Sequence, residues 1–508
     1  MVFCRQIMSS IQSVLIANRG EIAVRITKTL QRLGIKAYAV VSAADKNPLH
    51  ARVADEVISL PGNTVGETYL NAALLVELCL KHKIDAVHPG YGFLSENAGF
   101  SKACRDAGIA FIGPSPEAIA SMGSKAESKI LMRKFGVPTI PGYDGEDQSP
   151  EVLSREALRI GFPVLLKASA GGGGKGMRVV EAEVELTGAI ESAKNEGRKS
   201  FGDDRLIVEK YLKKPRHIEF QVFGDSHGHM IHLGERECSI QRRHQKIIEE
   251  SPSPALTPEL RTRMGEAAVK AAKAVAYSNA GTVEMILDAE HNFYFLEMNT
   301  RLQVEHPVTE LVTGLDLVEW QIRVARGECL PFTQEQVVFR GHAIECRVYA
   351  EDPENKFLPS IGPLLIYKEP TAPFLRIDSG VDEGSTIVLD FDPMISKVIA
   401  AGASREEAIS RMLWALRHYP ILGVKTNHAF LAAVLDHPVF HSGNISTGFL
   451  SENLPAYKDS PAPRLVEAFS RLLTADLVTA SQPVRGANQA SAASLADAWV
   501  MNKGFRSA

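Results

Sequence analysis

Two glutamates in the sequence are spaced so that they could hold a cation between them. Glu284 and Glu297 lie in strand-like runs, and a two- or four-residue loop centred between Glu290 and His291 would pair them directly. Paired residues of an antiparallel hairpin have Cβ atoms about 5 Å apart, so the two carboxylates would repel each other without a positive charge between them. Ligands that offer only oxygen favour Mg²⁺ or Mn²⁺ over zinc. The pattern therefore predicts a metal site, with an exposed hairpin face as the alternative.

The second of these glutamates begins a run of polar residues at every other position. The run consists of Glu297, Asn299, Arg301, Gln303 and Glu305. Alternate side chains of an extended chain project from one face, so all five are predicted to lie together. We expect this face to belong to the same site as the metal ligands.

A run of glycines provides a second candidate site. Residues 171–174 are four glycines followed by Lys175, and they lie between strands predicted at 163–168 and 176–180. Consecutive glycines lose much backbone entropy on ordering, but they let backbone N–H groups approach a ligand closely, and lysine adds a charge for phosphate. The run predicts a phosphate cradle, with a flexible linker as the alternative. It is not a Walker A loop, because no Gly-Lys-Ser/Thr follows.

A basic segment at 241–246 provides Gln241, His244 and Lys246. Acidic residues flank it on both sides and stacking aromatic residues are absent, which favours a small anion over nucleic acid. Nearby Cys238 is interpreted as a structural cysteine rather than a nucleophile. His88, in a Pro-Gly turn, is interpreted as a residue that orients its loop.

The composition limits the class of protein. The chain has 508 residues, 45% of them hydrophobic and 23% charged, with a formal net charge of −4. These values exclude a mainly disordered chain, and the charge disfavours a general electrostatic attraction to nucleic acid or an anionic membrane. The six cysteines are dispersed, without a Cys-x-x-Cys pair, which excludes a disulfide scaffold or a zinc ribbon. We expect a cytoplasmic enzyme of about three domains that does not enter a membrane.

The order of predicted elements indicates an α/β start. Strands at residues 13–17 and 37–41 enclose an amphipathic helix, a βαβ unit that predicts a parallel sheet. The first turn lacks the Gly-x-Gly-x-x-Gly pattern, so no dinucleotide site is predicted there. Thr257 is a predicted helix N-cap, and Ser404 with Glu407 forms a predicted capping box.

Taken together, these motifs resemble those of the biotin carboxylases of the ATP-grasp superfamily. The likeness covers about residues 12–455. It rests on IANRGEIA at 16–23, HPGYGFLSEN at 88–97, KASAGGGGKGM at 167–177, EKYL at 209–212, QRRHQK at 241–246, EMNTRLQVEHPVTE at 297–310 and GHAIECRVYAEDP at 341–353. Two positions depart from the pattern of the family. Phe391 stands where many relatives have Tyr, and Lys175 stands where some relatives have Arg.

The resemblance implies an α/β and α+β multidomain fold. Its parts would be a Rossmann-like parallel-sheet N-terminal domain at 12–123, a connector with the ATP-grasp lid at 124–212, an ATP-grasp core with the metal and bicarbonate site at 213–340, a biotin carboxylase C-terminal domain at 341–455 and an Ala/Ser-rich tail at 456–508.

The resemblance also implies a role for each matched residue. Glu305 would be the base that deprotonates bicarbonate, and Arg347 would stabilise the biotin enolate. Bicarbonate would be held by Lys246, Arg301, Gln303 and Val304, and the metal by Glu284, Glu297 and Asn299. The nucleotide site would comprise Lys125, Lys167, Gly172, Gly173, Gly174, Lys175, Glu209, Lys210, Leu212, His217, Gln241 and His244, with Lys246 at the phosphates.

The implied reaction uses ATP and two Mg²⁺ or Mn²⁺ ions to activate bicarbonate as carboxyphosphate and to carboxylate biotin. No Met-Lys-Met biotinylation motif occurs in the chain. We therefore expect biotin to be presented by a separate biotin carboxyl carrier protein, with a carboxyltransferase subunit as second partner and a homodimer as the assembly. The alternatives are another ATP-grasp carboxylate–amine ligase and a catalytically inactive carboxylase scaffold.

Overall fold

We describe a computed structural model of the chain, which covers residues 10–45, 47–168, 177–201, 203–243 and 245–458. The described residues up to Tyr457 belong to one compact unit. Among them, every helix is too short or too polar to cross a lipid bilayer.

The N-terminal part is a parallel sheet of five strands in the order β3-β2-β1-β4-β5, which confirms the predicted βαβ start. Helix α1 forms here because Ile22, Ile26 and Leu30 recur on one face, where all three are buried. The elements are β1 (Ser13–Ile16), α1 (Gly20–Arg32), β2 (Lys36–Val41), α2 (Leu49–Val53), β3 (Glu56–Ser59), α3 (Ala72–His82), β4 (Ala86–His88), α4 (Ala98–Asp106), β5 (Ala110–Phe111) and α5 (Pro116–Gly123).

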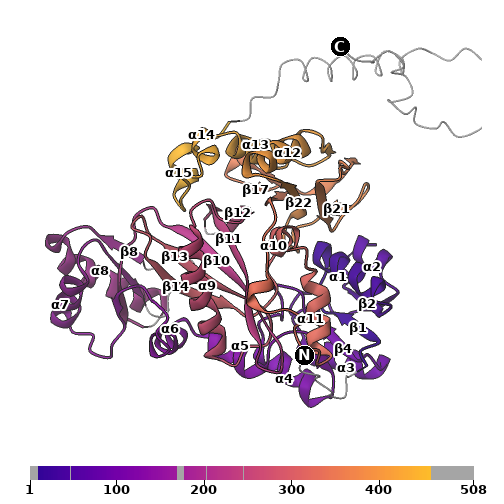
Figure 1. The fold of residues 1–508 in the computed structure, drawn as a ribbon, viewed down its shortest axis with the longest axis horizontal. Coiled ribbons are helices and arrows are strands. Elements are labelled where there is room, and N and C mark those ends of the chain that lie inside the picture. Colours follow the sequence, from indigo (N-terminus) through magenta and orange to yellow (C-terminus); the bar gives the residue numbers. More distant parts are fainter. Residues whose placement is uncertain (1–9, 46, 169–176, 202, 244, 459–508) are drawn as a thin grey trace, which may run out of the picture. The chain divides into compact units, whose positions relative to one another are not determined.

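A second, smaller sheet follows, with strand order β6-β9-β7-β8. Its elements are α6 (Lys125–Lys134), β6 (Gly142–Tyr143), α7 (Pro150–Ile160), β7 (Val164–Ala168), β8 (Met177–Val180), α8 (Glu183–Phe201) and β9 (Leu206–Lys210). Strands β7 and β8 confirm the strands predicted on either side of the glycine run, and the run itself lies outside the described residues. Figure 1 shows this sheet and the N-terminal sheet on opposite sides of the third sheet.

The third sheet has eight strands in the order β14-β13-β10-β11-β12-β15-β22-β20, and all its pairings are antiparallel. Its strands are β10 (Arg216–Gly224), β11 (Met230–Arg242), β12 (Gln245–Ser251), β13 (Asn279–Leu287), β14 (Phe293–Asn299), β15 (His342–Tyr349), β20 (Leu375–Ser379) and β22 (Met394–Gly402). The sheet is continuous across residue 340, so strands from both sides of that position share one hydrogen-bonded layer.

The two faces of this sheet differ in character. At the β10–β13 end, Ile218, Phe220 and Val283 point into an apolar core under helix α9 (Pro258–Lys273). The residues between them, including Glu219 and Glu284, point to the other face, because alternate strand residues face opposite ways. One face therefore carries packing and the other carries charge.

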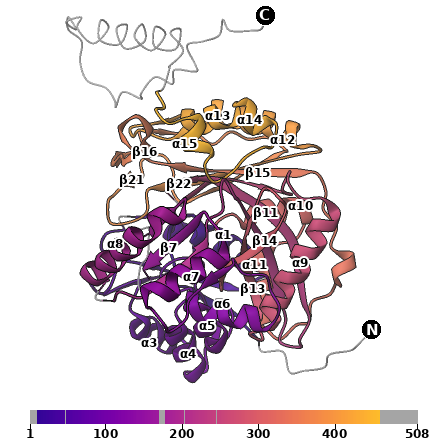
Figure 2. The same cartoon turned by 90° about the vertical axis from the view of Figure 1, so that its left-hand side faces the viewer.

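The C-terminal helices cover the apolar face at the other end of the sheet. Helix α12 (Arg405–Arg417) and helix α13 (His428–Leu435) pack on β15 and β22 around Ile344, Val398 and Met412, as Figure 2 shows. The remaining elements here are β16 (Glu351–Asp352), β17 (Leu358–Pro359), β18 (Gly362–Pro363), β19 (Ile366–Tyr367), β21 (Thr386–Ile387), β23 (Ile421–Leu422), α14 (Pro438–His441) and α15 (Phe449–Asn453), with 3₁₀ turns at Gln334–Gln336 and Pro353–Asn355.

The two predicted helix starts are found, one of them with a difference. The Thr257 side chain accepts a hydrogen bond from the backbone N–H of Leu260, as expected of an N-cap. Ser404 accepts from the N–H of Glu407. The Glu407 carboxylate, however, accepts from the N–H of Ala403 and not of Ser404, so the capping box is only half formed.

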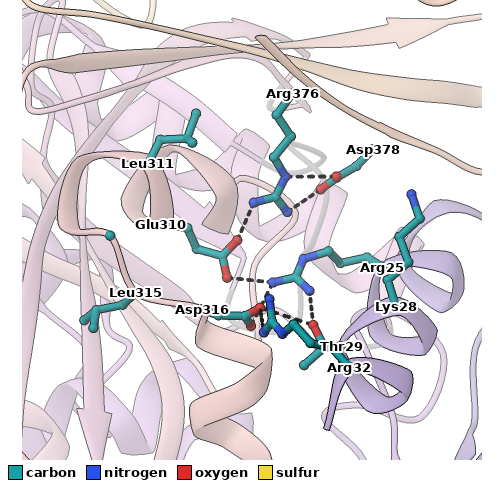
Figure 3. A pocket seen from close by; sticks show the side chains of 11 residues that line it. Arg25, Lys28, Thr29, Arg32, Glu310, Leu311, Leu315, Asp316, Arg376 and Asp378 are labelled. Atoms are coloured by element: carbon teal, nitrogen blue, oxygen red, sulfur yellow. Dashed lines mark hydrogen bonds and ion pairs between the residues drawn. The ribbon is translucent and has the colours of Figure 1, made fainter. Parts of the chain in front are cut away.

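A buried ion-pair network joins the N-terminal helix α1 to the third sheet through helices α10 (His306–Thr313) and α11 (Leu317–Ala325) (Figure 3). Glu310 lies at its centre: one oxygen is 2.9 Å from Arg25 and the other 2.6 Å from Arg376. Arg25 also contacts Asp316, and Arg376 contacts Asp378 on its own strand. This network fixes the position of α10 relative to both neighbouring sheets.

Removing the central carboxylate should loosen the network. Glu310→Gln leaves two largely buried arginines short of one negative charge, so we expect the free energy of unfolding to fall by about 3 kcal/mol, because an unbalanced buried charge is costly. Urea denaturation would measure the change. The matched control is Asp106→Asn, which breaks an exposed pair with Lys102 and should cost less than about 0.5 kcal/mol. Equal losses of stability in the two variants would contradict the role assigned to Glu310 in this ion-pair network.

Candidate active site

A row of charged residues crosses the polar face of the eight-stranded sheet. Glu284 on β13 pairs with Glu297 on β14 on one side and with Glu219 on β10 on the other. Glu219 pairs in turn with Arg236 on β11. The predicted opposition of Glu284 and Glu297 is therefore confirmed.

The route by which the chain reaches this pairing differs from the prediction. The turn between the strands runs from Asp288 to Asn292, five residues rather than two or four, and a β-bulge lies next to the Glu284–Glu297 pair. The bulge changes which face each residue points to. Phe293 and Phe295 enter the apolar core, while Glu297, two positions further, lies on the polar face.

Lys246 on β12 neutralises three carboxylates of this face. Its ammonium is 2.5 Å from Glu219, 2.8 Å from Glu284 and 2.8 Å from Glu305. Burial alone would lower the pKa of Lys246, but the three carboxylates raise it well above its usual value. The lysine is therefore a fixed positive charge at neutral pH.

The second oxygen of Glu284 faces a histidine of defined tautomer. The Gln241 amide donates to Nδ1 of His217 over 2.6 Å, which leaves the ring proton on Nε2. That nitrogen is 3.1 Å from Glu284. Although burial opposes ionisation, Lys246 and His217 hold the pKa of Glu284 well below its usual range. Glu284 is thus an ionised carboxylate surrounded by donors.

Glu305 is fully buried between two cations. One oxygen is 2.8 Å from Lys246 and the other 3.0 Å from Arg347 on β15. Burial would raise the pKa of Glu305, but Lys246, Arg347 and Arg236 lower it well below its usual value. Arg347 also contacts Glu249 over 2.6 Å, so it is shared by two carboxyl groups.

The prediction that the alternating run stays extended as far as Glu305 is wrong. Strand β14 ends at Asn299, and Glu305 is the residue before helix α10, which begins at His306. The first helical residues here include Pro307, whose ring fixes φ at a helical value. The chain therefore returns Glu305 to the sheet from a helix start, and it reaches Lys246 by this route and not along the strand.

Between these two points, Arg301 and Gln303 form a small polar cluster. Arg301 donates to Glu96 over 2.8 Å and to the side-chain oxygen of Gln303 over 3.0 Å. The Gln303 side-chain nitrogen is buried and has no hydrogen-bond partner among the described residues. A buried donor without a partner is costly, so this nitrogen is suited to an incoming acceptor. The carbonyl of Val304 accepts from Lys397 over 2.9 Å.

The smaller sheet holds a separate charged group. Glu209 on β9 is bonded by Lys129 of α6 and by Lys167 of β7. Burial opposes ionisation of Glu209, but the two lysines hold its pKa below the usual value. The ammonium of neighbouring Lys210 instead donates to the carbonyls of residues 161 and 162 over 3.0 and 2.8 Å. Leu212 follows β9 and is partly exposed.

Several predicted nucleotide residues cannot be placed. Gly172, Gly173, Gly174, Lys175 and His244 lie outside the described residues, as does the side chain of Lys125, whose backbone begins α6.

Some residues of the site were not predicted from the sequence. They are Glu96, Lys129, Glu219, Arg236 and Glu249. For Lys129 a signal existed, because it lies four positions after Lys125 and so on the same helical face. Glu219, Arg236 and Glu249 become visible only when the strand register is known, and Glu96 lies in a turn that meets Arg301 only in the folded chain.

The two residues interpreted as structural fit that interpretation. Cys238 is buried, and burial raises the pKa of its thiol well above its usual value, which disfavours a reactive thiolate. His88 is buried, its Nδ1 accepts from the N–H of Gly90 over 3.1 Å, and burial lowers its pKa to about 3. His88 is therefore neutral and holds its turn.

Comparison with known proteins assigns the fold. The family models that match are described as biotin carboxylase, N-terminal domain, over residues 10–119; carbamoyl-phosphate synthase L chain, ATP binding domain, over residues 124–333; and biotin carboxylase C-terminal domain, over residues 345–452. The biotin carboxylase domain of a Hydrogenobacter thermophilus 2-oxoglutarate carboxylase, in a structure with MgADP, ADP and bicarbonate, superposes with a TM-score of 0.82 at 46% identity, over 90% of this chain and 100% of that one. The three sheets therefore form an ATP-grasp ligase fold.

Two relatives of known name support the same assignment of the fold. A biotin carboxylase of Halalkalibacterium halodurans is 49% identical over 87% of this chain and 98% of its own length. The mouse mitochondrial methylcrotonoyl-CoA carboxylase subunit alpha is 50% identical over 87% of this chain, which spans 62% of that relative's length. The chain belongs to the biotin carboxylase family.

The carboxyl group of Glu249 should make stability depend on pH. Burial raises the pKa of Glu249 to about 7, although Arg347 opposes this. The folded state therefore keeps a proton that the unfolded chain releases from about pH 4.5, so Glu249 lowers stability as pH rises from about 4.5 to about 7. Its share of the slope approaches about 1.4 kcal/mol per pH unit.

Glu249→Gln removes this titration. The difference in free energy of unfolding between variant and wild type should shift in favour of the variant as pH rises across that window, measured by urea denaturation at several pH values. Glu290→Gln, in the exposed hairpin turn, is the control and should leave the slope unchanged. A pH-independent difference for Glu249→Gln would contradict the assignment.

Proposed function

We propose that the chain uses ATP to activate bicarbonate as carboxyphosphate and transfers the carboxyl group to N1′ of biotin. The observation that carries this proposal is the meeting of Lys246, Glu305 and Arg347 at one buried point. It joins a base held in its ionised form to two fixed positive charges. Such a pair of cations suits a reaction in which an anionic substrate becomes more negative.

Glu305 acts as the general base. Because Lys246 and Arg347 keep it ionised, it can take the proton of the bicarbonate hydroxyl at neutral pH. The freed oxygen then attacks the γ-phosphorus of ATP, forming an O–P bond as the bond to the β-phosphate oxygen breaks and ADP leaves. Carboxyphosphate then splits into carbon dioxide and inorganic phosphate, and N1′ of biotin bonds the carbon dioxide as its proton passes to the phosphate.

Bicarbonate lies against Arg301, Gln303 and Lys246, with the backbone of Val304 beside it. The guanidinium of Arg301 provides a planar fork for a planar anion. The buried nitrogen of Gln303, which has no partner within the described residues, supports this assignment because bicarbonate would supply the missing acceptor.

ATP lies between the smaller sheet and the eight-stranded sheet. The ammonium of Lys210 already donates to two backbone carbonyls, so we assign the contact of Lys210 with the nucleotide to its backbone. The nucleotide residues that we propose are Lys125, Lys167, Gly172, Gly173, Gly174, Lys175, Glu209, Lys210, Leu212, His217, Gln241 and His244.

Glu284, Glu297 and Asn299 hold the two Mg²⁺ or Mn²⁺ ions. Two opposed carboxylates and an amide fit a hard cation that prefers oxygen ligands. When bound, the ions neutralise phosphate charge during phosphoryl transfer. In the present structure the amide of Asn299 donates to Glu284 over 2.9 Å, so the protein alone already draws the two side chains together.

Arg347 stabilises the enolate form of biotin. Biotin arrives on a separate carrier protein, and the carboxyl group passes to a carboxyltransferase subunit of an acyl-CoA carboxylase.

The chain forms a homodimer, which is supported by the dimer named for the H. thermophilus relative. We propose the cytoplasm as the location, and the mitochondrial names of some relatives are the alternative. The domain boundaries predicted from the sequence stay as predictions.

The two alternatives make different predictions. A carboxylate–amine ligase shares the central ATP-binding match, but the flanking biotin carboxylase matches do not favour it. Its ADP release would be insensitive to biotin. An inactive scaffold would release no ADP in response to bicarbonate.

Replacing the base should stop the chemistry without preventing nucleotide binding. Glu305→Gln should lower kcat by at least about 100-fold, the usual scale for general base catalysis, while calorimetry shows ATP affinity within about threefold of wild type. The matched control is Glu219→Gln, which removes a different carboxylate from the same ammonium and should lose much less activity. Loss of ATP binding together with turnover would mean that Glu305 is structural.

The metal assignment predicts a shift in cation dependence. Glu284→Gln and Glu297→Gln each remove a charged oxygen ligand, so the Mg²⁺ concentration for half-maximal rate should rise by about tenfold or more. The control is Glu290→Gln in the exposed turn of the same hairpin. An unchanged Mg²⁺ requirement in both site variants would reject the assignment.

The carrier assignment predicts a strong substrate preference. A biotinylated carrier protein should be carboxylated with a kcat/KM at least about 100-fold above that of free biotin, because docking orients the ring and raises its effective concentration. Radiolabelled bicarbonate would measure both rates. Equal values would show that no carrier docks.

A further inference from the structure

Away from the site described above, three side chains of different chemistry meet where β10 turns into β11. They are Asp225, His229 and Cys329, and one ligand atom of each lies within 4.8 Å of the other two. Asp225 is six residues along the chain from Glu219, or about 20 Å at the rise of a strand. We propose that these three residues bind one Zn²⁺ ion as a structural site.

The carboxylate of Asp225 is already held in position by hydrogen bonds. It is 3% exposed, and it accepts hydrogen bonds from the backbone N–H groups of His227, His229 and Leu330 over 2.8, 3.1 and 2.9 Å. Three backbone donors leave the side chain little freedom, so binding a metal would cost little further ordering.

His229 needs only a small movement. Its Nδ1 is 2.8 Å from Asp225 Oδ2, and its side chain is 60% exposed. Zinc would replace the proton shared by these two atoms, and the imidazole proton would move to Nε2, which faces away from the bond. Zinc–nitrogen and zinc–oxygen distances are each about 2.0–2.2 Å, so at a tetrahedral angle the two ligand atoms would separate by about 0.5–0.8 Å.

The third ligand determines the type of metal. Cys329 is partly exposed and follows helix α11. A thiolate with imidazole and carboxylate favours zinc over the hard cations Mg²⁺ and Ca²⁺, and three protein ligands leave a fourth tetrahedral position for water. Binding releases the thiol proton, so affinity increases with pH.

The site would join two segments that are distant in the sequence. Asp225 and His229 belong to the β10–β11 turn, whereas Cys329 lies about 100 positions later, a separation already bridged by the 3.0 Å contact between His227 and the carbonyl of Gly327. Zinc would add a covalent-strength link across the same junction. It would therefore stabilise the fold without touching the reacting groups.

Cobalt spectroscopy tests this site directly. The full chain, treated with EDTA and returned to excess Mg²⁺ to fill the oxygen sites, is titrated with Co²⁺. One equivalent should produce the near-ultraviolet band of a thiolate–Co²⁺ bond, which oxygen ligands cannot give, and Zn²⁺ should displace it. Zn²⁺ should also raise the Tm.

Two variants and one control complete the test. Cys329→Ser should abolish the band and the zinc-dependent rise in Tm. His229→Gln, at an exposed side chain, should weaken Co²⁺ binding more than about tenfold, since one of three ligands is lost. His82→Gln, on the exposed side of α3, should change neither. A wild-type chain without the band, or a band that persists in Cys329→Ser, would overturn the proposal.

Discussion

Three buried carboxylates converge on the ammonium of Lys246, and the need to balance charge away from water governs the rest of the site. An isolated buried ion is too costly to persist, and each of these three carboxylates has a second partner besides Lys246. Arg236 bonds the other oxygen of Glu219, His217 faces Glu284, and Arg347 serves Glu305. The face is thus a lattice of acids neutralised by buried bases, and a cation that enters beside Glu284 must share that carboxylate with Lys246.

This lattice depends on a rigid support, which the eight-stranded sheet provides. Glu305 does not belong to the sheet and is positioned by the start of α10. That helix has eight residues, and Glu310, its fifth residue, is held by Arg25 and Arg376. Helix α1 of the N-terminal part is therefore linked to the base through one short helix, which is held at its middle by Glu310.

Part of the site and part of the fold could be predicted from the sequence alone, because residue type and spacing are local information. The opposition of Glu284 and Glu297, the βαβ start and the N-cap at Thr257 are of this kind. Glu219, Arg236 and Glu249 could not be found in this way, since nothing local distinguishes them from surface charges. They face the site because of pairings between strands far apart in the sequence. The path of the chain from Asn299 to Glu305 was mistaken for a strand because alternation was extended beyond the point at which the sheet ends.

The bulge beside Glu297 has a consequence for how this strand can change over evolutionary time. The bulge reverses which face alternate residues of β14 point to. Phe293 and Phe295 therefore pack in the core beneath the sheet, whereas Glu297 and Asn299 lie on the polar face with the reacting groups. In an unbroken strand all four would share one face, and selection on the core would conflict with selection on the site. With the bulge in place, mutations in the apolar half are free of that conflict, and the ligand half can be kept while its support is rebuilt.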